Sequence, residues 1–190
     1  MQATTSLNGV DLERLSAVID AVAGNAALGE FRFRVDNRWI DGGHSRAAIQ
    51  GFFGVGHEDA SRTEPFVVDT DEPTVLLGNN LAPNAGEYLL HALAACITAT
   101  VAYHAAARGI ALGGLECTVE GDVDLRGFLG LDPSVRPGFE QIRATLTVDG
   151  DLDDAQFAAI TGLPDFSPVR DSVANPVPLS VSVVRKEPRP

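Results

Sequence analysis

Residues 84–110 read NAGEYLLHALAACITATVAYHAAARGI, an alanine- and leucine-rich run that is apolar on nearly every side of a helix. Asn84 is a suitable N-cap, Glu87 stands three residues later as in a capping box, and Gly109 suits the position after the last turn. These signals predict one long helix from about residue 85 to residue 108. A helix without a polar face must be covered on all sides, so we expect a second subunit to supply part of the cover.

Composition narrows the class of protein further. The chain has 190 residues, of which 45% are hydrophobic and 21% charged, as is typical of one folded domain. Its 14 Lys+Arg and 26 Asp+Glu give a net charge of -12, which argues against nucleic acid or an anionic membrane as a partner. The run at 88–107 could cross a bilayer by length, but His91 and His104 within it favour a core helix. Because the N-terminus lacks the pattern of a signal peptide, we expect a cytoplasmic protein.

Period-two alternation predicts strands on both sides of the long helix. In chain order we expect a helix over 12–24, strands at 31–35, 46–53 and 66–69, the long helix, strands at 115–125 and 142–148, a helix at 153–161, a short helix starting at Ser167-Pro168, and a last strand at 177–183. A turn at Asp41-Gly42-Gly43 makes the first two strands a hairpin. This order predicts an α+β domain over residues 30–190, with residues 1–29 as an N-terminal helical extension.

The residues alone give few signals of chemistry. Cys117 falls on the apolar side of a predicted strand, and Cys96 lies in the middle of the long helix, so both are first interpreted as packed cysteines. Four histidines without metal-ligand spacing predict no metal site, and no motif for a nucleotide or other cofactor is present.

The quoted run and the order of elements resemble the OsmC/Ohr family over about residues 30–185. The family's long Ala-rich helix carries a cysteine after an LxAAxAAC-like run, which here ends at Cys96, and its Cys-Pro-Val helix start here reads Ser167-Pro168-Val169. The resemblance implies an OsmC-like fold, in which antiparallel sheets wrap around two central helices in an intertwined homodimer.

Active members of the family reduce hydroperoxides with two cysteines. The resemblance makes Cys96 the nucleophile, whose thiolate attacks the peroxide and becomes a sulfenic acid. The second, resolving cysteine matches Ser167, and a serine cannot form the disulfide that completes the cycle. Cys117 is not at the resolving position.

The family also uses an arginine to stabilise the thiolate and a glutamate to hold that arginine. The turn Gly42-Gly43-His44-Ser45-Arg46 resembles the arginine-bearing turn of the Ohr branch, so either Arg46 or His44 is the candidate cation. The glutamate position of that branch, ten residues before the cysteine, is Gly86, and Glu87 follows it. At about 100° per residue, Glu87 and Cys96 face opposite sides of one helix, so Glu87 either serves the other subunit or acts only as a cap.

We therefore expect a one-cysteine hydroperoxide reductase in the oxidative stress response, with Cys96, Arg46 or His44, and Glu87 as its site. Its partners would be a small or hydrophobic hydroperoxide and an external thiol or dithiol reductant. The alternative is a catalytically degenerate member that binds a small hydrophobic ligand at the dimer interface. A purely structural or interaction domain is the third interpretation.

Overall fold

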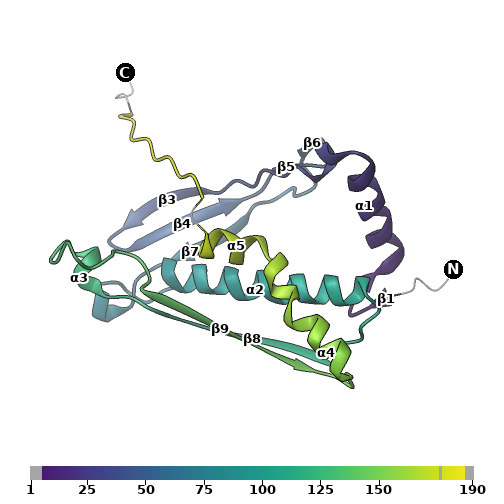
Figure 1. Ribbon diagram of the computed structural model, residues 1–190. Helices are drawn as coiled ribbons and strands as arrows, with labels where there is room; N and C mark the ends of the chain where they lie inside the picture. The colour runs from purple at the N-terminus through teal and green to yellow at the C-terminus, as the bar shows by residue number, and fades with distance from the viewer. Residues whose placement is uncertain (1–5, 176, 187–190) are drawn as a thin grey trace.

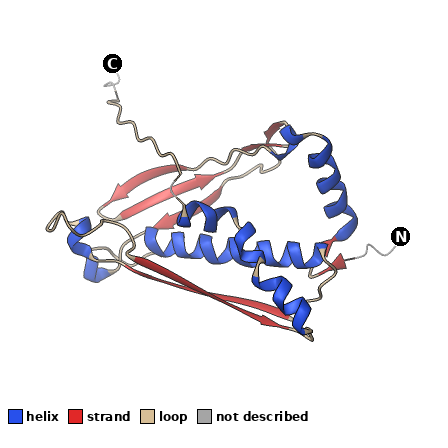
Figure 2. Cartoon of the chain, viewed as in Figure 1, coloured by secondary structure: helices blue, strands red, loops and turns tan. Residues whose placement is uncertain are grey.

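The long helix α2, Ala85–Ala107, lies between two antiparallel sheets in the computed structural model, which describes residues 6–175 and 177–186 (Figures 1 and 2). The strands are β1 (Ser6–Leu7), β2 (Val10–Asp11), β3 (Asp36–Asp41), β4 (His44–Ile49), β5 (Phe52–Gly54), β6 (His57–Asp59), β7 (Phe66–Thr70), β8 (Gly114–Asp122) and β9 (Gln141–Asp149). The α-helices besides α2 are α1 (Leu12–Gly24), α3 (Leu125–Phe128), α4 (Asp154–Thr161) and α5 (Pro168–Ala174), and the 3-10 helices are η1 (Ala26–Gly29), η2 (Thr74–Leu76) and η3 (Leu163–Phe166).

Each sheet is antiparallel throughout. The larger one has the order β3-β4-β7, and the hairpins β1-β2, β5-β6 and β8-β9 form two-stranded sheets. Figure 1 shows β3-β4-β7 on one side of α2 and β8-β9 on the other, with α4 and α5 packed in front. This arrangement confirms the predicted α+β class.

The helix α2 begins and ends where the local signals predict. Asn84 and Glu87 form the capping box reciprocally, and Gly109 adopts a φ of 70°, a left-handed conformation that glycine accepts without strain. The helix is long and apolar enough to span a membrane by length and composition. Of the 18-residue stretch that meets this test, 28% is buried within the chain.

The core lies at the carboxyl half of α2. Val101 and Ala105 are fully buried and cluster with Ile110, Ile160 and Leu163. Partly buried side chains of β8, β9 and the neighbouring loops pack against the cluster: Leu112, Leu115, Leu146, Val148 and Leu152. The amino half of α2 and the β3-β4-β7 sheet contribute little to it.

From β8 to α5 the chain follows the prediction, except that the strand predicted over 115–125 ends at Asp122 and Leu125 begins the short helix α3. β8 and β9 pair in continuous register from Gly114↔Asp149 to Asp122↔Gln141. Asp153 and Gln156 form a capping box at the start of α4. Ser167 caps α5, with Pro168 in its first turn, as the Ser-Pro pair predicts.

The first predicted strand is wrong in position. The hairpin forms about Gly42-Gly43, but β3 begins only at Asp36, and within 31–35 a single bridge joins Arg32 to Phe53. The alternating residues are instead held by aromatic stacking, since the rings of Phe31 and Phe33 lie about 6 Å from each other and from Phe52. The chain leaves the hairpin ladder after Ile49, so the second predicted strand is divided into β4 and β5.

The N-terminal extension is anchored to the main body. The side chain of Asn8, in the turn between β1 and β2, donates to the carbonyl of Ile110 and accepts from the amide of Leu112, both at 2.9 Å. Asp11 then caps α1, which ends at Gly24 as predicted.

The predicted last strand does not form within one chain. Residues 177–186 are extended but pair with no strand in the described parts of the chain, and they lead away from the body in Figure 1. Leu179 is 84% exposed and Val183 96%. The alternation of Val177, Leu179, Val181 and Val183 is that of a strand, but no strand edge within residues 6–175 pairs with it.

Candidate functional site

Cys96 lies at the middle of α2 on a partly buried face. Its neighbours Leu93 and Ile97 are buried, whereas Ala95 and Ala99 are exposed, so the thiol sits at the border between the packed and the open side of the helix. Its sulfur forms no disulfide, and no hydrogen bond or ion pair joins its side chain to another described residue.

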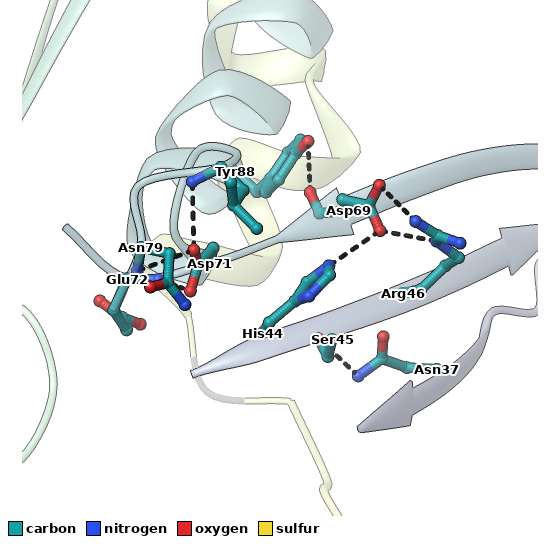
Figure 3. Close-up of polar contacts among 10 residues, drawn as sticks. Asn37, His44, Ser45, Arg46, Asp69, Asp71, Glu72, Asn79 and Tyr88 are labelled. Atoms are coloured by element: carbon teal, nitrogen blue, oxygen red, sulfur yellow. Dashed lines mark hydrogen bonds and ion pairs between the residues drawn. The ribbon is translucent and has the colours of Figure 1, made fainter. Parts of the chain in front are cut away.

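The candidate cations Arg46 and His44 both bind the same carboxylate, that of Asp69 (Figure 3). Arg46 and Asp69 are direct cross-strand partners on β4 and β7. The guanidinium donates from Nε and Nη2 to the two carboxylate oxygens at 2.7 and 3.0 Å, and His44 Nε2 lies 3.2 Å from Oδ1. The hydrogen bonds from Arg46, and then from His44, lower the pKa of Asp69. The guanidinium is thus already charge-paired in one chain.

Tyr88 connects this cluster to α2. Its hydroxyl donates to the backbone carbonyl of Asp69 at 2.9 Å, which fixes β7 against the first turn of the helix (Figure 3). Cys96 lies eight residues further along α2, or about 12 Å along the axis. The structure therefore brings Arg46 and His44 together, but it places their cluster beside the amino end of α2 rather than at Cys96 of the same chain.

Asp71 is a buried carboxylate that sequence reasoning missed. It accepts hydrogen bonds from the backbone amides of Glu72, Asn79 and Leu81 at 2.8, 3.0 and 3.1 Å, and it is fully buried. The bond from Leu81 and the other two amides lower its pKa. Asp71 thereby holds the loop that leads into α2. The only signal in the sequence was its place in an Asp-Glu-Pro turn.

Glu87 acts as a cap. Its carboxylate accepts from the Asn84 amide at 2.8 Å, and the Glu87 amide donates to Asn84 Oδ1 at the same distance. Next to it, a Cβ built on Gly86 would lie 3.3 Å from both Asn84 Oδ1 and the ring of Phe139. A side chain at residue 86 would therefore have to displace these neighbours by a few tenths of an ångström.

Ser167 and Cys117 occupy different surroundings. Ser167 is fully buried, and its hydroxyl accepts from the Arg170 amide at 3.3 Å as the cap of α5. Cys117 is only partly buried on β8, because it borders a groove next to α2, so its packing is looser than predicted. Burial nevertheless raises the pKa of its thiol, which disfavours the thiolate. Within residues 6–175 and 177–186, no three His, Cys, Asp or Glu side chains gather as metal ligands.

Comparison with known proteins defines the family. A sequence model of the OsmC-like protein family matches residues 78–182, which is more than half of the chain and includes α2 and the β8-β9 hairpin. The chain therefore belongs to the OsmC-like family. A search of curated proteins found no match.

Solved structures share the fold at low sequence identity. An OsmC-like protein from Mycoplasma pneumoniae is 15% identical, with a TM-score of 0.58, and the match covers 76% of this chain and 89% of that one. A protein assigned to osmotic stress induction and detoxification, from Psychrobacter arcticus 273-4, is 17% identical, with a TM-score of 0.55 and coverage of 73% and 85%. The organic hydroperoxide resistance protein OsmC from Legionella pneumophila is 17% identical, with a TM-score of 0.50 and coverage of 74% and 88%.

Proposed function

We propose that this OsmC-like protein serves in the cytoplasmic response to oxidative stress by reducing hydroperoxides with one cysteine. The observation that carries the proposal is the position of Cys96, an unpaired thiol at the middle of α2 where its side chain borders the open face of the helix. In the reaction, the thiolate of Cys96 attacks one peroxide oxygen and the O–O bond breaks. The leaving alkoxide takes a proton to become an alcohol, and Cys96 becomes a sulfenic acid.

An external thiol completes the cycle in this proposal. The thiol condenses with the sulfenic acid, so that water leaves and a mixed disulfide forms. A second thiol, or the second thiol group of a dithiol, then attacks the mixed disulfide and returns Cys96 to its reduced state. Ser167 cannot replace this external thiol, because its buried hydroxyl forms no disulfide.

The cation that stabilises the thiolate comes, in this proposal, from a second copy of the chain. In one chain, the cluster of Arg46 and His44 lies by the first turn of α2, and Glu87 faces away from Cys96. The open stripe of α2 is made of small side chains at Ala92, Ala95 and Ala99, and it lies beside Cys96. A second α2 packed on this stripe would bring residues of the partner to the thiol.

The exposed apolar surface supports this homodimer. Phe33 and Trp39 are 72% and 70% exposed, and the unpaired segment 177–186 adds five more large apolar side chains. Large apolar surfaces that one chain leaves exposed often mark contacts with a partner chain. We propose that the second copy covers this surface together with the stripe on α2.

The test is hydroperoxide consumption by purified protein with dithiothreitol or glutathione as reductant. We expect activity in the wild type and in Cys117→Ala, and only background consumption in Cys96→Ser. Arg46→Met should slow the reaction, whereas Arg34→Met, which breaks a similar exposed pair with Glu58, should not. Equal rates in wild type and Cys96→Ser would refute the proposal. No consumption by any variant would favour the alternative, a ligand-binding protein without peroxidase activity.

The end point of oxidation provides a second test. After one equivalent of peroxide, intact-mass spectrometry should show the gain of one oxygen, or of one reductant molecule if a thiol is present. The loss of two hydrogens would instead reveal a disulfide between Cys96 and Cys117. Ser167→Cys should lose two hydrogens through a disulfide between Cys96 and the cysteine introduced at position 167, if the start of α5 reaches Cys96.

A further inference from the structure

We propose that the groove between α2, β9 and α5 binds an amphiphilic carboxylate, such as the anion of a medium-length fatty acid. The groove has a volume of about 740 Å³, within the range of small-molecule sites. Its walls are mainly apolar side chains from the three elements: Leu89, Leu93, Ile97, Ile142, Leu146 and Val173. The site lies within one chain and involves no thiol chemistry, so it goes beyond the proposed reaction at Cys96.

The rim of the groove carries two guanidinium groups and one carboxylate. Arg136, Arg170 and Glu140 line it, and Arg170 is already paired with Asp165, so Arg136 is the cation that has no ion-pair partner among the described residues. An apolar cavity with such a guanidinium at its rim is complementary to a molecule that joins an alkyl chain to an anionic head.

Of the two guanidinium groups, that of Arg136 is the one open to such a head. Arg136 lies over Gly138, where a built Cβ would be 3.6 Å from its Nη2, and it has neither a hydrogen-bond nor an ion-pair partner among the described residues. Arg170 donates from Nη2 to Asp165 at 2.9 Å and remains 42% exposed. Because a guanidinium can donate two parallel bonds to a carboxylate, Arg136 is the first candidate to hold the head.

The two cysteines lie differently with respect to this groove. Cys117 is part of its lining, whereas Cys96 is not, although Leu93 and Ile97 on either side of it are. A ligand in the groove should therefore cover the thiol of Cys117 and leave that of Cys96 accessible. This difference allows occupancy to be measured separately from any peroxidase activity.

The experiment measures thiol labelling of the reduced, full-length protein with N-ethylmaleimide, resolved by peptide mass spectrometry. Dodecanoate below its micellar concentration should slow labelling of Cys117 and leave the rate at Cys96 unchanged. Dodecyltrimethylammonium, with the same chain and the opposite charge, should protect neither. Equal protection by the cationic amphiphile, protection of both cysteines, or protection of neither by dodecanoate would overturn the proposal.

Variants then test the head-binding residues by calorimetric titration with dodecanoate. Arg136→Met and Arg170→Met should each weaken binding by about tenfold, as expected for loss of a charged hydrogen bond. Arg14→Met, on α1, removes an arginine elsewhere and should leave the affinity unchanged. Wild-type affinity in both groove variants would overturn the proposal. So would a fall in native mass when dodecanoate binds, because the groove would then be an interface between copies of the chain.

Discussion

Glu87 is the residue for which a structural role and a role in catalysis can be separated. Glu87→Gln keeps an oxygen that can accept from the Asn84 amide, whereas Glu87→Ala removes the cap. We expect Glu87→Ala to lose about 1 kcal/mol of unfolding free energy in urea denaturation, and Glu87→Gln to lose little.

The rate of peroxide consumption at Cys96 tests whether Glu87 also has a role in catalysis. If Glu87 of the partner subunit holds the stabilising arginine, Glu87→Gln should slow peroxide consumption while stability is preserved. Unchanged consumption in Glu87→Gln would restrict the residue to its role as a cap.

Asp71 should make stability depend on pH in the acid range. Its pKa is lowered in the folded chain, chiefly by the Leu81 amide, so its contribution is complete above the ordinary carboxyl value of about 4 and is lost as the pH falls through the lower folded value. Asp71→Asn should therefore melt below the wild type at pH 7, with a difference that narrows towards pH 3. Circular dichroism melts measure this, with the exposed Asp20→Asn as control. Parallel melting temperatures across the range would contradict the assignment.

At the scale of elements, the contact between α2 and β8 depends on glycine. A Cβ built on Gly121 would lie 2.6 Å from the ring of Phe139, and the same ring lies against Gly86 of α2. We expect Gly121→Ala to lose about 1–3 kcal/mol of unfolding free energy, because the ring must shift. Gly114→Ala on the same strand is the control, since its nearest contact is 3.6 Å away and ordinary. Equal urea midpoints for the two variants would show that the ring moves without cost.

Elements were predictable where their signals are local. The ends of α2 follow from Asn84, Glu87 and Gly109, and β8 and β9 follow from a strict alternation over nine residues. The segment 31–35 has the same alternation without a ladder, because stacked rings can satisfy it as well as strand pairing can. Alternation marks which side chains are apolar, but strand pairing depends on where the turn directs the chain.

For the whole molecule, we expect a homodimer that depends on the carboxyl-terminal segment. Light scattering should give twice the chain mass of 20.0 kDa over a wide range of concentration. Truncation after Asn175 removes the exposed residues 177–186 and should shift the protein towards the monomer or reduce its solubility. A stable monomer of the full chain would remove the shared-site argument, and with it any role for Glu87 in catalysis.

The site was predictable only in part. Cys96 and Ser167 could be singled out as candidates because each lies in a short motif at a fixed place in an element. The pairing of Arg46 and His44 with Asp69 joins residues more than twenty positions apart, and Arg136 and Arg170, which line one groove, are also at least that distant in the sequence. Such contacts depend on sheet register and helix packing, which the alternation of side chains does not encode.

The loop held by Asp71 has a consequence for amide hydrogen exchange. Its carboxylate occupies the amides of Glu72, Asn79 and Leu81, and the Asn80 amide donates to the Glu72 carbonyl at 3.0 Å. Exchange requires these hydrogen bonds to open, and here one buried carboxylate accepts three of them. In deuterated water, this segment should retain its protons for as long as a strand does, although it lies outside any sheet. Its amides should be released together, as one unit, when Asp71 leaves its place.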